Sequence, residues 1–238
     1  MLTRLYRRSP ASFALACIAV YALFMGLGNT LSACLGAAYS GNMLLAALLA
    51  AALLLWSGRS GLRRALGLCR PRGGRRVLWY VPLAAVAACN LIGWRGYPVP
   101  VRETAFAAAA MLLAGLLEEL LFRGLLLGAL GRMGPRRAVW LSAIAFGLGH
   151  LLNLLGGADA WETAMQGICA VAVGVMLALL ALRCGSILPG ALMHGALNVL
   201  GVLSAPSEER TVLIAALMTV ISAAYAASLR PSGEKKEK

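Results

Sequence analysis

Long apolar runs make up most of this chain, and they are separated by short segments that hold turn formers and arginine. The runs cover residues 11–35, 42–56, 77–94, 104–130, 138–155, 163–182, 186–203 and 211–229, and the second is short enough that we expect it to begin nearer Tyr39. A helix needs about 20 apolar residues to cross a bilayer. We therefore predict an all-α, polytopic transmembrane helix bundle with about eight transmembrane helices.

The composition supports a membrane protein. Hydrophobic residues make up 61% of the chain and charged residues 13%, and the mean hydropathy is +0.80. A soluble domain carries roughly 25% charged residues. This chain has too few polar side chains to cover a surface that faces water.

The basic residues alternate from loop to loop. Of the 22 Lys and Arg residues, 18 fall in the N-terminal segment, every second loop and the C-terminal tail, three fall in the other loops, and Arg123 lies inside an apolar run. Basic loops mark the cytoplasmic side of a membrane. We expect both termini in the cytoplasm, and we attribute the net charge of +13 to these loops rather than to nucleic-acid binding. The small, alanine- and arginine-rich chain favours a bacterial plasma-membrane protein.

The first apolar run could also be a cleaved signal segment. Arginines precede it, and Leu31-Ser32-Ala33-Cys34 resembles the cleavage box of a lipoprotein. However, the run at 11–35 is longer than the roughly 7–15 residues of a usual signal core. We expect this segment to remain as the first helix.

Ionisable residues are rare inside the apolar runs. They are Glu118, Glu119 and Arg123 in the fourth run, His150 in the fifth and His194 in the seventh. A charged side chain at the bilayer centre costs roughly 2.5–3.5 kcal/mol on insertion scales, so such residues usually face a protein interior. All three helices carry them roughly 12–20 Å from the cytoplasmic edge, counted at helical rise. We predict that they share one cavity.

Spacing within the fourth run predicts different roles for its two glutamates. Glu119 and Arg123 are four residues apart, with the acid first, the favoured order for an ion pair. Glu118 is rotated by about 100° on an α-helix. We expect Arg123 to hold Glu119 and Glu118 to remain free to face the cavity. The alternative is that both acids share one arginine for a purely structural purpose.

Similar spacing unites polar residues on the other two helices. His194 shares a face with Asn198, and His150 shares a face with Phe146. Small residues lie beside these positions, and we expect them to allow close helix packing. They are Gly124, Gly128, Gly147, Gly149, Gly190 and Gly195.

Three motifs resemble those of the CPBP family of intramembrane proteases, also called the CAAX-protease and Abi family. They are E-E-x-x-x-R at 118–123, F-x-x-x-H at 146–150 and H-x-x-x-N at 194–198, the last preceded by Ser-Ile-Leu-Pro at 186–189. Each motif alone is weak, but their order on successive helices is specific. The resemblance covers about residues 104–203.

The resemblance implies an endopeptidase that cleaves a membrane protein or a lipidated peptide within the membrane. By analogy, Glu118 and His150 activate a water molecule, and His194 and Asn198 stabilise the oxyanion. The residues that would orient these catalytic side chains without contacting substrate are Glu119, Arg123 and Phe146. The implied layout is a helical segment at 1–103, a catalytic core at 104–203, a last helix at 204–229 and a charged tail at 230–238.

Metal dependence is open at this point. If zinc is bound, Glu118, His150 and His194 would be its ligands, because catalytic zinc favours three protein ligands and water. The sequence lacks H-E-x-x-H, none of its six cysteines lies near the motifs, and no two form C-x-x-C. We favour a reaction without a metal cofactor and regard the cysteines as packing residues.

Two other functions compete with proteolysis. Intramembrane Glu, His and Arg also build the proton relays of transporters. Many transporters show two related halves, whereas the polar residues here cluster between 118 and 198. A non-catalytic membrane partner, such as a bacteriocin-immunity protein, is the second alternative.

Overall fold

The structure, a computed structural model, describes residues 1–72, 80–94 and 100–229, and its regular elements are helices. Six helical segments are long and apolar enough to cross a bilayer: Pro10–Leu35 (α2), Ser40–Arg59 (α3), Val101–Met133 (α5, η3, α6 and η4), Pro135–Gly156 (α7 and η5), Ala160–Cys184 (α8) and Glu208–Leu229 (α10). Two apolar helices are shorter, Val81–Gly93 (α4 and η2) and Leu188–Val202 (α9). A short helix, Leu2–Arg8 (α1), precedes them.

Each of the eight predicted apolar runs thus corresponds to a helical segment, and the all-α membrane fold is confirmed. The second run begins at Ser40, next to Tyr39 as expected. That the two shorter helices also cross the bilayer stays a prediction.

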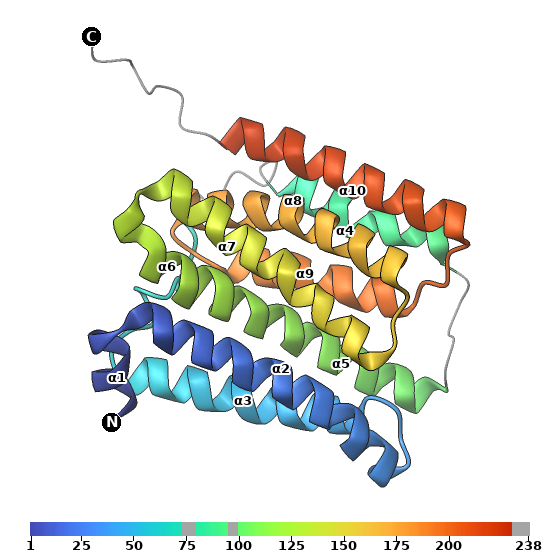
Figure 1. Ribbon diagram of the computed structural model, residues 1–238, viewed down its shortest axis with the longest axis horizontal. Helices are drawn as coiled ribbons and strands as arrows, with labels where there is room; N and C mark the ends of the chain where they lie inside the picture. The colour runs from blue at the N-terminus through green and yellow to red at the C-terminus, as the bar shows by residue number, and fades with distance from the viewer. Residues whose placement is uncertain (73–79, 95–99, 230–238) are drawn as a thin grey trace.

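The helices form a bundle in which α5 is central (Figure 1). On one side, α5 packs against α3, which pairs with α2 in a helical hairpin. On the other side, α5 packs against α9, which packs against α4, while α7 packs against α8 and α8 against α10. The segment η3, which continues α5, contacts both α7 and α9, so the helices that carry the predicted site residues meet there.

The bundle has large apolar side chains on its outside and charged ones within. Leu192, Val220 and Leu148 are 71%, 65% and 58% exposed, whereas Glu119 and Arg123 are 0% and 4% exposed. A soluble protein would show the opposite distribution. An apolar exterior over long helices suits a lipid environment, where all backbone groups must be bonded within the helices.

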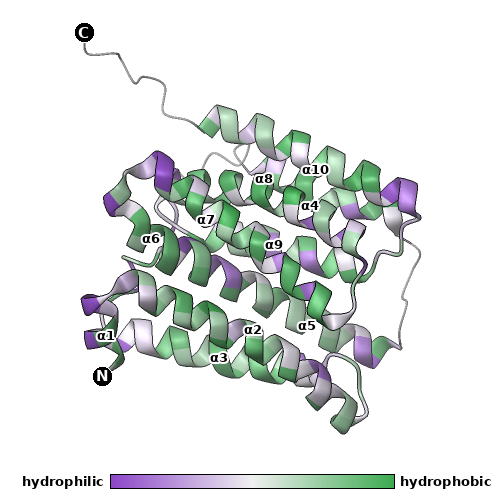
Figure 2. Cartoon of the chain, in the orientation of Figure 1, coloured by the Kyte–Doolittle hydropathy of each residue, from purple (hydrophilic) through white to green (hydrophobic). Residues whose placement is uncertain are grey.

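Hydrophilic residues gather at the ends of the helices, and apolar residues cover their middle parts (Figure 2). The N-terminus and the C-terminal end of α10 lie at the same end of the bundle (Figure 1). This arrangement agrees with two termini on one side of a membrane. That this side is the cytoplasm stays a prediction from the basic loops.

Glycines allow the central helices to approach closely, as expected for most of the positions considered. A Cβ atom on Gly195 would lie 3.0 Å from the Leu112 side chain on α5, and one on Gly147 would lie 2.8 Å from the carbonyl oxygen of Gly167 on α8. The expectation fails for Gly128, where a Cβ atom would meet nothing within 4 Å. Gly128 is exposed on the outside of its turn of helix.

Candidate active site

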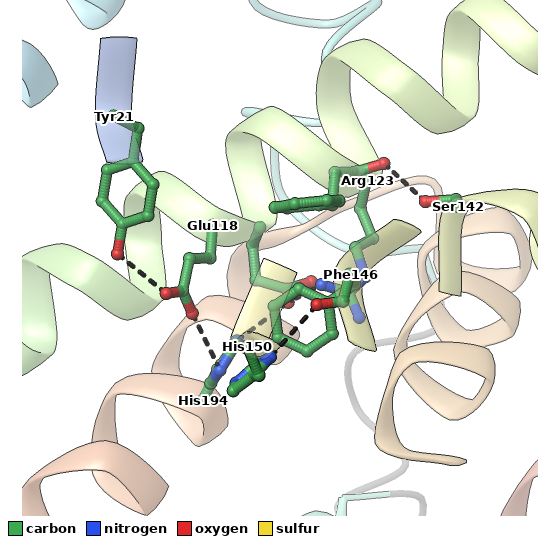
Figure 3. A network of polar contacts seen from close by, with 9 residues as sticks. Tyr21, Glu118, Arg123, Ser142, Phe146, His150 and His194 are labelled. Carbon is green, nitrogen blue, oxygen red and sulfur yellow. Dashed lines mark hydrogen bonds and ion pairs between the residues drawn. The ribbon is translucent and has the colours of Figure 1, made fainter. Parts of the chain in front are cut away.

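Polar residues of α5, η3 and α9 meet in one network, and His150 packs beside it against Phe146 (Figure 3). His194 on α9 lies between the two glutamates that end α5 and begin η3. Its Nε2 atom is 3.1 Å from Glu118 Oε2, and its Nδ1 atom is 3.1 Å from Glu119 Oε1. The imidazole therefore bridges two adjacent carboxylates.

A π-helix begins at this bridge. Regular α-helix ends at Glu118, and η3, a π-helix at Glu119–Leu126, follows directly. Such wider turns occur frequently at functional sites. The expectation of regular α-helix through the motif is therefore wrong, and the change in winding begins between the two glutamates.

A neighbouring helix binds the wider turn. The Ser142 hydroxyl on α7 donates a hydrogen bond of 2.9 Å to the Phe122 carbonyl oxygen. Ser142 is 1% exposed, so this bond is shielded from water. It gives the altered backbone a buried polar partner and fixes α7 against η3.

The predicted ion pair between Glu119 and Arg123 is present. Arg123 Nη1 lies 2.8 Å from Glu119 Oε1, and the two side chains are 0% and 1% exposed. The guanidinium also lies over the Phe146 ring, 4.5 Å from its centroid. A buried charge is stable only when paired, so Glu119 and Arg123 depend on one another.

Phe146 forms the apolar wall against which both histidines pack. Its ring makes edge-to-face contacts with His150 and His194, at centroid distances of 5.0 and 5.4 Å. The Phe146 carbonyl oxygen lies 3.1 Å from His150 Nδ1. When Nδ1 carries the proton, this contact leaves Nε2 of His150 as an acceptor.

His150 lies at a change of helix type that the sequence did not predict. The α-helix α7 ends at Gly149, and η5 at His150–Gly156 is a 3-10 helix. His150 is half-buried there. Its position at the helix end places it at the edge of the network rather than in the middle of a regular span.

Glu118 is not free, in contrast to our expectation. The Tyr21 hydroxyl on α2 donates a hydrogen bond of 2.7 Å to Glu118 Oε1, and His194 faces Oε2. The Glu118 side chain is nevertheless 17% exposed, against 1% for Glu119. Glu118 is therefore more exposed than Glu119, in agreement with the different roles predicted for the two acids. It is not free, however, because Tyr21 on α2 bonds to it.

Tyr21 is the site residue that sequence reasoning missed. It lies in the first apolar run, where a tyrosine resembles any other amphipathic aromatic residue. The available signal was its hydroxyl, a polar group near the middle of a span. A buried hydroxyl needs a partner, and its own helix offers few free groups.

A cavity of about 420 Å³ adjoins the network, between α8, α9, α10 and the neighbouring segments. Four predicted site residues contribute to its wall: Phe146, His150, His194 and Asn198. Most of its other lining residues are apolar, and the polar ones are Asn90, Glu162, Gln166, Ser204 and Thr211. Glu118, which we expected to face the cavity, is not part of its wall, but its Oε2 atom lies 3.1 Å from Nε2 of the wall residue His194.

The two contacts of His194 limit where the protons of the network can lie. A neutral imidazole carries one N–H, yet both ring nitrogens of His194 face carboxylate oxygens. A second proton is therefore required, either on the ring or on one of the carboxyl groups. Such an arrangement can both accept and return a proton next to a cavity.

Zinc ligands would have to come from the side chains of this network. Across residues 1–72, 80–94 and 100–229, no three His, Cys, Asp or Glu side chains converge to hold a metal ion. Each ring nitrogen of His194 faces a separate carboxylate. Since a zinc-bound histidine commonly bonds to a carboxylate through its other nitrogen, a reaction without a metal stays a prediction.

The fold and the network define a polytopic membrane protein with an enclosed acid–histidine site. Comparison with known families adds that residues 75–200 match the family described as type II CAAX prenyl endopeptidase Rce1-like. The chain belongs to this family, as the resemblance of its three motifs predicted. The match begins at residue 75, earlier than the motifs indicated, and it ends beyond Asn198.

No curated protein and no solved structure matches the chain. The family assignment therefore rests on the matched segment, which contains Glu118, His150, His194 and Asn198. Tyr21 lies outside it.

Proposed function

We propose that this protein is an intramembrane endopeptidase that hydrolyses a peptide bond in a membrane-associated or lipidated protein. The observation that carries the proposal is the bridge of His194 between Glu118 and Glu119, beside a cavity that His150 and Asn198 also line. Membership of a CAAX prenyl endopeptidase family supports the same reaction. A multi-pass chain of this kind would act on substrates that already lie in or on the bilayer.

In the proposed reaction, Glu118 and His150 activate a water molecule. Glu118 accepts a proton from the water, while the acceptor nitrogen of His150 holds the other hydrogen. The water oxygen attacks the carbonyl carbon of the substrate. Glu118 then returns its proton to the amine nitrogen as the C–N bond breaks, so that no proton is lost from the site.

The negative charge that develops on the carbonyl oxygen needs hydrogen-bond donors. We assign this role to His194 Nε2 and the Asn198 side chain, which lie one helical turn apart on α9. The contact of His194 Nε2 with Glu118 Oε2 would be exchanged for the oxyanion when substrate is bound. Glu119 would keep hold of the other ring nitrogen and fix the orientation of the imidazole.

We propose that the reaction needs no metal ion. The base, the donors and the proton carrier named above are all side chains of this protein. Cleavage that persists after thorough chelation in metal-depleted buffer is the expected result, and its loss with recovery on adding zinc would contradict it.

We also propose that residues 104–203 form the catalytic core and that residues 1–103 and 204–229 support it. Contacts of α3 with α5 and of α10 with α8 agree with this division. The predicted charged tail at 230–238 lies outside the described residues. A bacterial plasma membrane remains the location we expect.

The proposal is tested by comparing protein termini in cells that carry the wild-type chain or Glu118→Ala. We expect at least one peptide terminus to disappear in the variant, and its sequence would identify the substrate. Glu103→Ala is the matched control, because Glu103 starts the same helix and lies outside the network, with Arg102 at 3.9 Å. Identical termini in all three strains would contradict the proposal. If Glu118→Ala also kept the cellular phenotype of the wild-type chain, a non-catalytic role would be favoured.

A further inference from the structure

Tyr21 connects the N-terminal helices to the proposed site by one specific bond. Its hydroxyl lies 2.7 Å from Glu118 Oε1, across 97 residues of sequence. The second oxygen of the same carboxylate faces His194 at 3.1 Å. The carboxylate is therefore held from two helices, α2 on one side and α9 on the other (Figure 3).

The position of Tyr21 is set by packing. Helix α2 contacts η3, and the Tyr21 ring packs against a core cluster that includes Leu121 and Phe122. The ring is therefore held in an apolar environment that offers its hydroxyl few alternatives. Glu118 satisfies that hydroxyl, and a hydrogen bond to a charged group is among the stronger bonds in proteins.

We propose that Tyr21 is a positioning residue that holds the Glu118 carboxylate in the orientation needed for proton transfer. The Tyr21 hydroxyl donates its hydrogen bond to Glu118, so we assign it a role through that carboxylate. The inference rests on the proposed function, because it assigns Glu118 the role of base. It also extends the site beyond the family-matched segment at 75–200, to a helix that the motifs do not include.

Tyr21→Phe tests the inference, because it removes one oxygen atom and keeps the ring. We expect kcat to fall by about 10- to 100-fold, the effect of losing one hydrogen bond to a charged group. We expect KM to change by less than about two-fold, since the cavity wall is untouched. The substrate is a synthetic peptide that spans the terminus dependent on Glu118, supplied to purified protein in liposomes.

Tyr6→Phe is the matched control. Tyr6 is also an N-terminal tyrosine, and its ring packs edge-to-face with Phe13 and Trp56, at 5.6 Å in each case. This variant should keep the wild-type kcat and KM. An unchanged kcat in Tyr21→Phe, or a rise in KM that accounts for the whole effect, would overturn the inference.

A second measurement needs no substrate. The infrared spectrum of the wild type minus that of Glu118→Gln should contain the carboxylate stretching band of Glu118. The frequency of this band should shift in Tyr21→Phe and stay unchanged in Tyr6→Phe. A band at the same frequency in Tyr21→Phe would overturn the inference whatever the activity.

The two proposals fail in different ways. If Glu118→Gln is inactive and Tyr21→Phe is fully active, only the role of Tyr21 is wrong. If Glu118→Gln retains cleavage, the proposed function itself is wrong.

Discussion

The buried pair of Glu119 and Arg123 allows a quantitative test of how the network is held together. In Arg123→Met, the Glu119 carboxylate loses its cation at 2.8 Å while remaining 1% exposed. Removing one partner of a buried pair costs about 3–5 kcal/mol, because an uncompensated charge stays in the interior. We therefore expect the free energy of unfolding to fall by about this amount.

The second half of the test restores neutrality. In the Arg123→Met background, Glu119→Gln removes the unpaired charge, while its amide oxygen still accepts a hydrogen bond from His194 Nδ1, now 3.1 Å from Glu119 Oε1. The double variant should therefore be more stable than Arg123→Met alone. We expect a coupling energy of about 2–3 kcal/mol between the two positions.

The assay is reversible unfolding in bicelles, followed by circular dichroism, for the wild type, both single variants and the double variant. Arg102 and Glu103 provide the control cycle, because this pair is 3.9 Å apart, with side chains 68% and 21% exposed. An exposed pair contributes little, so no coupling should be resolved there. Additive effects at 119 and 123 would refute our account of the buried network.

Three further predictions concern packing, orientation and metal. Gly115→Ala should lower stability by about 1–3 kcal/mol in thermal unfolding, since its Cβ would lie 2.4 Å from the Gly195 amide nitrogen, whereas Gly128→Ala, with open space around it, should not. Cys34, the exposed cysteine near the end of α2, should react with a membrane-impermeant maleimide in intact cells, and no labelling would reverse the predicted orientation. Prolonged chelation should leave peptide cleavage by the purified protein unchanged within about two-fold.

Much of the site could be predicted from the sequence, because charged residues are costly in a bilayer and therefore few. Glu118, His150 and His194 had to face a common interior, and the spacing of Glu119 and Arg123 favoured their ion pair. These inferences use helix periodicity and the cost of exposing charge to lipid, which depend on local sequence. The structure confirms the ion pair and the meeting of the two glutamates with His194.

The parts that failed depend on contacts between distant segments. The π-helix at Glu119–Leu126 is accompanied by a bond from Ser142 on another helix, which no periodicity within the run reveals. The partner of Tyr21 lies 97 residues away, so its hydroxyl had no visible acceptor. Gly128 is the same residue type as Gly195, yet only at Gly195 would a Cβ atom meet atoms of another helix.

The most direct test of the central claim is the rate of peptide cleavage by purified wild-type and Glu118→Gln protein in liposomes. Glutamine keeps the shape of the side chain and can still contact Tyr21 and His194, but it cannot accept a proton from water. Our account predicts that cleavage falls to the background of empty liposomes while the variant remains folded. Cleavage by Glu118→Gln at the wild-type rate would contradict it.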